Sequence, residues 1–350
     1  MSERFVSGSV MPDGDPRPTT SAVRVFDRSI GALTERLDDP PLKISVMKPF
    51  AILILMAFAV IQLPAQTRFR GEIELVGIGV TVADRKGSLI TALTKDDFDV
   101  YEDGRLQTVR YFARGTETSE EEALHLGLLF DTSGSMEQDI AMSRTAAIKF
   151  LNALPAAQDM TLVEFSTEVR LSRYSQDDFA RLVERIRGRK PDGSTALYDA
   201  LGVYLANAAE ITGRKILVLY SDGGDTRSSA SWSDILDVLK ASDVTIYVVG
   251  FLEHQSQSAR TNQGYQLRHI AGLTGGQAFF PTTTKDVDAA YDQVLAELRA
   301  QYTLGYVSTN TKMDGSWRKV EIKLNRAALR AMKTRSRNGY YAPFREAVAR

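Results

Sequence analysis

The stretch LHLGLLFDTSGSM, residues 124–136, decides the fold class of this 350-residue chain. Its first half is almost continuously apolar, which is typical of a strand buried on both faces of a parallel sheet. Apolar residues at helical spacing follow from Ile140, and apolar strands then alternate with amphipathic helices as far as residue 300. This alternation predicts an α/β fold with a doubly wound, mostly parallel sheet and helices on both faces.

The expected strands and helices of this α/β unit can be placed by residue number. The strands are expected at 124–130, 160–165, 169–171, 216–220, 244–251 and 278–281. The helices are expected from residue 140 onward and at 177–187, 195–211, 234–240, 265–273 and 286–299. In such sheets ligands bind beyond the carboxyl ends of the strands, near the point where the strand order reverses. Polar residues that directly follow a strand are therefore the candidates for a site.

Both flanks of the α/β unit show the alternation of apolar and polar residues that is typical of β-strands, at 76–82, 98–112, 302–306 and 320–324. Each flank alone has too few strands for a secure core. We therefore expect a small β-sandwich built from the N- and C-terminal segments, with the α/β unit inserted between its halves. The expected domains are an N-terminal β subdomain at 70–118, the α/β domain at 119–300 and a completing β segment at 301–345.

The front of the chain is not expected to belong to the fold. Residues 1–46 are rich in proline and lack a sustained period, so they are expected to be a disordered leader. Residues 47–65 combine a basic start, an apolar run at 50–61 and a small residue at Ala65, as in a secretory signal peptide. Met47 is then the expected start, and the protein is exported to the periplasm, cell surface or medium. An uncleaved membrane anchor at 50–67 is the alternative.

Composition excludes several kinds of site. The chain has 43 Lys and Arg residues against 44 Asp and Glu residues, whereas a nucleic-acid-binding domain is usually strongly basic. It has no Cys, which removes zinc–thiolate sites, iron–sulfur clusters and thiol nucleophiles. Only three His residues are present, so a histidine-rich metal site is not expected. Any metal chemistry must depend on oxygen ligands.

Candidate oxygen ligands lie in three predicted loops. Asp131, Ser133 and Ser135 come directly after the strand at 124–130, and Asp222 follows the strand at 216–220. Thr195 ends a third loop, at the start of a long helix. Two carboxylates and three hydroxyls are hard donors, which suit Mg²⁺, Mn²⁺ or Ca²⁺.

Asp131, Ser133, Ser135, Thr195 and Asp222 together resemble the pattern of the von Willebrand factor A (VWA) domain with its metal-ion-dependent adhesion site. That family has Asp-x-Ser-x-Ser after its first strand, a Thr before a central helix and an Asp after a later strand, on a Rossmann-like fold. The resemblance covers about 123–300. The flanking motifs at 93–104 and 337–341 also resemble an acidobacterial subfamily of exported VWA-related proteins.

The resemblance implies a binding function without catalysis. Ser133 and Ser135 would coordinate the ion directly, and Asp131, Thr195 and Asp222 would contribute directly or through water. The coordination position left open would accept an Asp or Glu carboxylate from a protein partner. Neither nucleic acid nor membrane is expected as a partner, apart from an uncleaved N-terminal segment.

Ordinary structural roles compete with this interpretation. Ser135 could begin a helix in a capping box with Gln138, and Ser194 or Thr195 could be a simple N-cap. The run at 221–224 could be a plain turn after a strand. All of these would have to coincide at carboxyl ends of strands, which favours a metal site.

The sequence leaves two other functions as alternatives. A Mg²⁺-dependent phosphohydrolase would use Asp131 as nucleophile, but the positions just behind it hold serines where a second carboxylate is needed. A VWA scaffold without metal-dependent binding is the remaining alternative. Two basic clusters are interpreted as solvated surfaces, the second partly as one exposed strand face: Arg181, Arg185, Arg187, Arg189 and Lys190; and Arg326, Arg330, Lys333, Arg335 and Arg337. His125, inside an apolar strand, is interpreted as structural.

Overall fold

A computed structural model describes residues 75–115, 123–153, 157–329 and 331–344. The chain divides into two units, 1–70 and 71–350, and the second contains all of the described residues. The predicted leader and signal segment lie outside the described residues and stay predictions, as do the predicted domain boundaries. Within the described part of the chain, no helix is long and apolar enough to cross a membrane.

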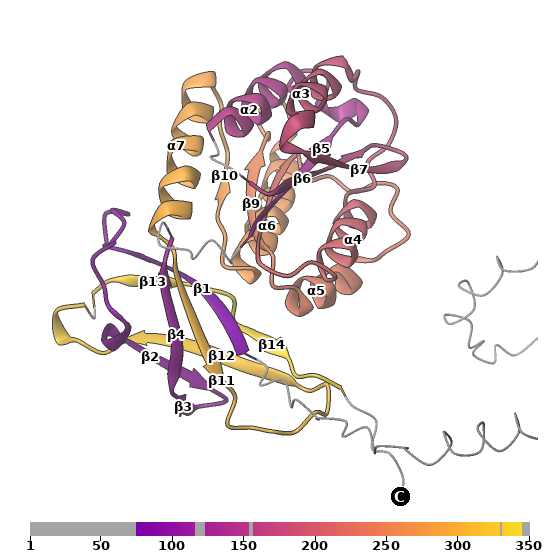
Figure 1. Ribbon diagram of the computed structural model, residues 1–350. Coiled ribbons are helices and arrows are strands. Elements are labelled where there is room, and N and C mark those ends of the chain that lie inside the picture. The colour runs from indigo at the N-terminus through magenta and orange to yellow at the C-terminus, as the bar shows by residue number, and fades with distance from the viewer. Residues whose placement is uncertain (1–74, 116–122, 154–156, 330, 345–350) are drawn as a thin grey trace, which may run out of the picture. The chain divides into compact units, whose positions relative to one another are not determined.

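The predicted α/β sheet is confirmed (Figure 1). It has six strands in the order β10-β9-β8-β5-β6-β7, and all neighbours are parallel except β7, which runs antiparallel to β6. The strands are β5 (Leu124–Asp131), β6 (Asp159–Phe165), β7 (Val169–Ser175), β8 (Arg214–Ser221), β9 (Thr245–Gly250) and β10 (Ala278–Phe279). Since β5 comes first in this unit and the later strands extend to either side of it, the order reverses between β5 and β8.

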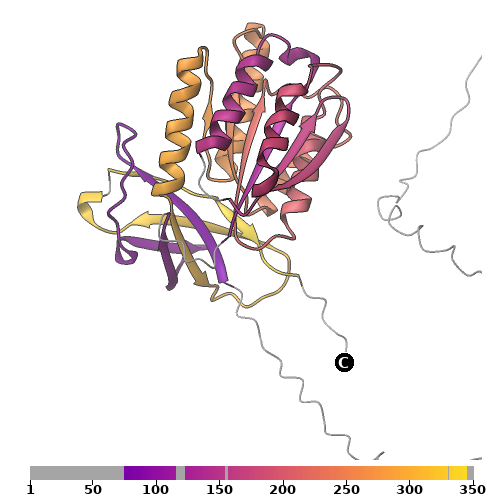
Figure 2. The same ribbon diagram turned by 45° about the horizontal axis from the view of Figure 1, so that its top comes forward.

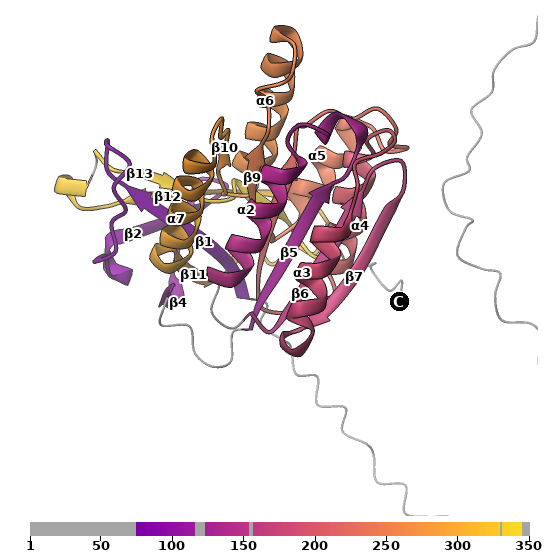
Figure 3. The ribbon, with the colours of Figure 1, turned by 90° about the horizontal axis from the view of Figure 1, so that it is seen from above.

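Helices cover both faces of this sheet, as Figure 3 shows. The helices are α2 (Ile140–Ala153), α3 (Phe179–Gly188), α4 (Leu197–Ala208), α5 (Trp232–Ala241), α6 (Gln257–Leu273) and α7 (Thr284–Ala300). Successive residues of β5 point to opposite faces of the sheet. Leu128 packs in the core beneath α2, α3 and α7, and Leu129 packs in the core beneath α4, α5 and α6. Gly127 allows the ring of Tyr204 to approach, because a Cβ there would lie 2.3 Å from it.

The predicted flanking β-sandwich is also confirmed (Figure 2). Two four-stranded sheets, β13-β1-β11-β4 and β14-β12-β2-β3, are antiparallel and draw on both ends of the described chain. Their strands are β1 (Leu75–Ala83), β2 (Phe98–Glu102), β3 (Arg105–Gln107), β4 (Val109–Arg114), β11 (Tyr302–Val307), β12 (Trp317–Leu324), β13 (Lys333–Arg335) and β14 (Gly339–Tyr341). One buried core, including Val80 and Ile322, lies between the sheets.

The chain leaves this sandwich after β4 and returns to it at β11. The two strands are neighbours, with Arg114 opposite Tyr302. Because the exit and the return lie side by side, the α/β unit can be inserted without breaking the pairing of the sandwich strands.

Three elements differ most from the predicted bounds. Helix α6 begins at Gln257, eight residues before the predicted start. The Ser256 hydroxyl caps it by accepting a hydrogen bond from the Ala259 amide. The first turns of this helix are polar, so the sequence shows no apolar periodicity there. Helix α4 begins at Leu197, later than predicted, so Thr195 lies in the preceding loop. Strand β7 extends to Ser175 as an edge strand whose polar side chains give little apolar signal.

Candidate metal centre

The carboxyl ends of β5 and β8 bring two of the predicted loops to the switch point of the sheet. Strand β5 ends at Asp131 and strand β8 at Ser221, and the two strands are hydrogen-bonded neighbours. Asp131 and Asp222 are 0% and 1% exposed. Two carboxylates therefore lie nearly without solvent at the edge where doubly wound sheets bind ligands.

The loop after β5 holds Asp131 and the two serines together. The Ser133 amide donates to Asp131 Oδ1 over 2.9 Å, and the Ser133 and Ser135 hydroxyls hydrogen-bond each other over 3.0 Å. Ser133 is buried, whereas Ser135 is exposed. The helical turn here is a short 3-10 helix, Gly134–Met136, which Ser133 precedes, so the capping-box interpretation of Ser135 is wrong.

The loop after β8 combines a turn with a link to Asp131. The Ser221 hydroxyl donates to Asp131 Oδ2 over 2.6 Å and accepts the Gly223 amide over 2.9 Å. Asp222 Oδ1 accepts the Gly224 amide over 3.0 Å. The turn interpretation of 221–224 is therefore correct, and the same residues also face Asp131. Gly223 has φ +80°, a conformation that strongly favours glycine.

The third loop carries Thr195, which is 4% exposed. Its backbone is held by Thr226, whose hydroxyl accepts the Thr195 amide over 3.0 Å. The Gly134 amide donates to Gly193 O over 3.0 Å, which joins this loop to the serine loop. Helix α4 has Ala196 at its N-cap without a side-chain bond, so neither Ser194 nor Thr195 caps it. The Thr195 hydroxyl makes no hydrogen bond to another described residue, although the residue is nearly buried.

The electrostatics of the site favour a cation. Burial, reinforced by the negative charge of Asp222, raises the pKa of Asp131 to about 7, against the bonds from Ser133 and Ser221. Burial also raises the pKa of Asp222, while its hydrogen bond with Ser135 lowers it and the charge of Asp139 raises it. Removing the protons leaves close, buried negative charges, and a divalent cation would offset their repulsion.

Three residues near the site were missed by the sequence reasoning. Gln255 Nε2 donates to Asp222 Oδ2 over 2.9 Å. Beside it, His254 Nδ1 lies 3.1 Å from Oδ2 of the buried Asp139. Asp139 follows the serine loop, and His254 and Gln255 lie in the loop after β9, where the sequence has no periodic or motif signal. Only the position of this loop, at the carboxyl end of a strand, could have drawn attention to it.

The donor set fits a hard divalent ion. Among the described residues there is no group of three or more His, Cys, Asp or Glu side chains that could hold a metal. The candidate site described here differs from such a group, since three of its five oxygen donors are hydroxyls. Asp131, Ser133, Ser135 and Asp222 are linked by the contacts described above, and Thr195 lies in a loop bonded to theirs. Carboxylate and hydroxyl oxygens are the ligands that Mg²⁺, Mn²⁺ and Ca²⁺ prefer.

Several other polar residues singled out in the sequence have structural partners. His125 is buried, with Nδ1 3.0 Å from Asp159 Oδ2 and Nε2 3.0 Å from Thr212 O, as its structural interpretation predicts. In the first basic cluster, Arg185 and Arg189 both pair with the buried Glu164, at 2.7 and 2.6 Å. That cluster is therefore only partly a solvated surface.

The second basic cluster corrects the expected exposed strand face. Arg335 pairs with the buried Glu297 of α7, and Arg337 is half-buried. Although β13 is an edge strand, the charge of Arg335 faces Glu297 of the α/β unit, and Arg337, which follows β13, lines a cavity.

Residues 125–293 match the von Willebrand factor type A domain. With the six-stranded sheet and the helices on both faces, this match shows that the chain contains a von Willebrand factor type A domain. The narrower resemblance to an acidobacterial subfamily stays a prediction. A comparison with curated proteins gave no match.

Solved structures similar to this chain include three from different organisms. A von Willebrand factor type A protein from Catenulispora acidiphila is 12% identical, with 78% of this chain and 74% of that chain covered and a TM-score of 0.44. The pilus adhesin SpaC from Lactobacillus rhamnosus GG is 11% identical, with 74% and 49% covered and a TM-score of 0.43. The manganese-loaded TRAP protein of Plasmodium vivax is 14% identical, with 71% and 100% covered and a TM-score of 0.41.

Proposed function

We propose that this chain is a metal-dependent protein-binding module. Asp131, Ser133, Ser135, Thr195 and Asp222 hold a Mg²⁺, Mn²⁺ or Ca²⁺ ion, and the ion binds an Asp or Glu carboxylate of a protein partner. The observation that carries the proposal is the meeting of three loops at the switch point, with two buried carboxylates beside hydroxyls that cap no helix.

The carboxylate and hydroxyl side chains would have different roles in such a metal site. Both oxygens of Asp131 already accept hydrogen bonds, which fix the position of its carboxyl group, and a bound dication would favour the deprotonated form. The hydroxyls of Ser133, Ser135 and Thr195 add neutral oxygens, which leave a dication incompletely neutralised. When bound, the ion would supply an open coordination position for the carboxylate of a partner. Ser135 is exposed, so the partner reaches this edge from solvent.

The same geometry favours binding over phosphoryl transfer. A nucleophilic Asp131 would need an accessible oxygen, but the residue is 0% exposed and both oxygens are bonded. Two residues later the chain has Ser133, which cannot serve as the second carboxylate of such an enzyme.

The metal site is tested by calorimetric titration of Mn²⁺ and Mg²⁺ into the chelator-stripped full-length chain. We expect saturable binding at one site, and its loss in the double variant Asp131→Ala, Asp222→Ala. Asp237→Ala is the matched control, since Asp237 is exposed on α5 and pairs with Lys240. A folded parent that binds neither ion, or a double variant that binds as the parent does, contradicts the proposal.

The partner chemistry is tested on the Mn²⁺-loaded protein by water-proton relaxation. A capped Gly-Glu-Gly peptide should displace ion-bound water and lower the relaxivity, whereas the matched Gly-Gln-Gly peptide should not. If both peptides change the relaxivity equally, the ion does not recognise a carboxylate and the proposed partner chemistry is wrong.

We also propose export, which rests on the sequence of residues 47–65 alone. Mass spectrometry of the protein from its native cells should find a chain that begins near residue 66. A chain that retains 50–67 and fractionates with membranes would instead identify the anchor.

A further inference from the structure

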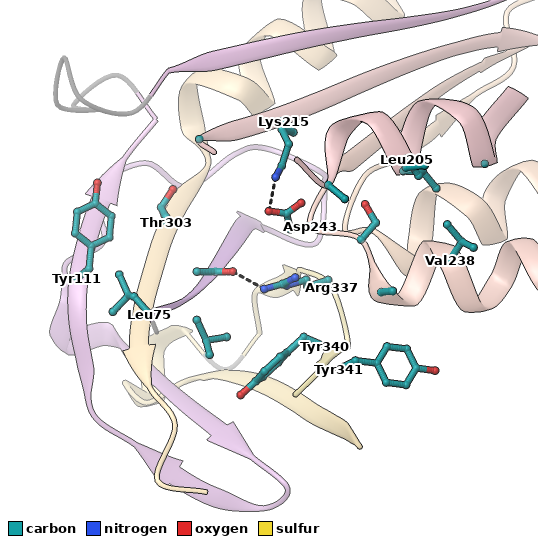
Figure 4. Close-up of a pocket in the computed structure, with 18 residues that line it drawn as sticks. Leu75, Tyr111, Leu205, Lys215, Val238, Asp243, Thr303, Arg337, Tyr340 and Tyr341 are labelled. Carbon is teal, nitrogen blue, oxygen red and sulfur yellow. Dashed lines mark hydrogen bonds and ion pairs between the residues drawn. The ribbon is translucent and has the colours of Figure 1, made fainter. Parts of the chain in front are cut away.

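A second site candidate lies at the opposite end of the strands from the metal centre. A cavity of about 770 Å³ is lined by the start of β8, the residues between α5 and β9, one face of α4, and the strands β1, β11 and β14 (Figure 4). Lys215, which lines it, is the second residue of β8, whereas Ser221 at the metal centre is the last. The cavity is therefore separate from the proposed metal site.

The walls of the cavity are mainly apolar and aromatic. Leu205 of α4 and Val238 of α5 lie on one side, and Leu75 and Tyr111 on the other. Val238 is 39% exposed and Leu75 is 46% exposed, so the mouth is open to solvent. An apolar body that entered would remove this surface from water, which favours binding.

Two cations line the cavity, and they differ in their partners. Lys215 Nζ lies 2.7 Å from Asp243 Oδ2 and donates to Ile211 O over 2.7 Å, so its charge is paired and two of its three N–H donors are used. Arg337 Nη2 donates to Gly77 O over 2.7 Å, and this is the one hydrogen bond that the guanidinium forms among the described residues. No carboxylate of the described chain lies within ion-pair distance of Arg337.

Arg337 is half-buried. Burial lowers the pKa of its guanidinium, while the charge of Asp243 acts in the opposite direction. The guanidinium lies 5.9 Å from the ring centre of Tyr340, and Figure 4 shows Arg337 between the Lys215–Asp243 pair and Tyr340. A partly desolvated guanidinium with unused N–H donors is matched by a carboxylate, which accepts two parallel hydrogen bonds.

We propose that this cavity binds a small monocarboxylate with an apolar body. Arg337 binds the carboxylate, and the walls formed by Leu205, Val238 and Leu75 enclose the apolar part. Asp243, already held by Lys215, repels a second anionic group, so a monoanion is preferred to a dianion. A cationic amphiphile is rejected by the charge of Arg337.

The probe is decanoate, titrated calorimetrically into the full-length chain, with decan-1-ol and decyltrimethylammonium as chain-length controls. We expect decanoate to bind at least about tenfold more tightly than decan-1-ol, and the cation not to bind. Because the metal centre lies at the other edge, a chelator should leave decanoate binding unchanged. Absence of decanoate binding, or equal binding of the alcohol, overturns the proposal.

Two variants test the residues. Arg337→Met should weaken decanoate binding about tenfold while leaving decan-1-ol unchanged, and Arg337→Lys should recover part of the loss. If Arg337 only ties β1 to the segment before β14, Arg337→Met changes stability and not this difference between probes.

The second variant does not depend on Arg337. Val238→Glu places a negative charge at the mouth on an exposed position, and it should abolish decanoate binding in a protein with unchanged circular dichroism. Val203→Glu is the matched control: this valine of α4 is 42% exposed and does not line the cavity. Unchanged decanoate binding in Val238→Glu would show that the ligand lies elsewhere.

Discussion

The Ser221 hydroxyl donates a 2.6 Å hydrogen bond to Oδ2 of Asp131, from the end of β8 to the end of β5. With the Ser133 amide on Oδ1, both oxygens of this buried carboxylate have donors. The bond crosses the switch point of the sheet, so it joins two of the three loops of the candidate metal centre. Ser221 therefore positions Asp131, although the sequence pattern singled out its neighbour Asp222.

Replacing Ser221 by Ala removes this bond and also the acceptor of the Gly223 amide. A buried acceptor and a buried donor then lose a partner, which costs about 1–3 kcal/mol of the free energy of unfolding. Urea unfolding in the presence of chelator measures this loss, and Mn²⁺ titration should show weaker binding. Ser258→Ala, on the exposed side of α6, is the control. A Ser221→Ala variant with parental Mn²⁺ affinity would show that Ser221 does not position Asp131 for the ion.

A substitution at Thr195 should change metal affinity without changing the stability of the fold. Its hydroxyl has no partner among the described residues, so Thr195→Val should leave the unfolding free energy in chelator nearly unchanged. We expect Mn²⁺ affinity to fall at least about tenfold, since even groups that only orient metal ligands contribute 10–100-fold. Calorimetric titration gives the affinity, with Thr261→Val on α6 as control. Parental affinity in Thr195→Val would remove Thr195 from the site.

The raised pKa of Asp131 predicts a pH dependence of the metal-free protein. The folded state holds the proton to about pH 7, whereas the unfolded state releases it near 3.8. The folded state therefore binds more protons in this window, and the free energy of unfolding falls as the pH rises through it, by up to about 4 kcal/mol. Mn²⁺ competes with the same proton, so its affinity should rise up to about pH 7 and then level off.

Urea unfolding in chelator between pH 4.5 and 8 tests this dependence. Asp222 contributes with the same sign because its pKa is also raised, so the Asp131→Asn variant isolates the effect of Asp131. If the parent and Asp131→Asn have the same slope, the raised pKa of Asp131 is wrong.

The fold class and the five candidate ligands could be predicted from the sequence because the signals for them are local. Each ligand follows a strand or precedes a helix, and in a doubly wound sheet those places meet at one edge. The apolar run before Asp131 was enough to place that edge. The fold class followed from the same alternation of strands and helices.

What the sequence did not show depends on contacts between distant elements. Gln255 and His254 reach the centre from a loop without any motif, and Ser221 bonds Asp131 across 90 positions of the chain. The first turns of α6 are polar, so no apolar period marked them. Arg335 was interpreted as exposed because its alternation with Lys333 resembles a solvent-facing edge, whereas its partner Glu297 belongs to a helix that the alternation cannot reveal.

The Arg335–Glu297 ion pair joins the two parts of the fold. Arg335 of β13 donates through Nε to Gly275 O over 3.0 Å and pairs with Glu297 of α7, so it links the sandwich to the α/β unit. Burial raises the pKa of Glu297, and Arg335 acts against that shift. Arg335→Met leaves the buried carboxylate without its cation, and we expect the free energy of unfolding at pH 8 to fall by about 3–5 kcal/mol.

The loss should shrink in the double variant Arg335→Met, Glu297→Gln, because no buried charge then remains. It should also shrink at lower pH, where Glu297 is protonated. Arg170→Met is the matched control, since the Arg170–Glu168 pair is exposed and should cost no more than about 1 kcal/mol. Urea unfolding of the four proteins measures these differences. If Arg335→Met costs no more than Arg170→Met, the buried pair does not hold the two parts of the fold together.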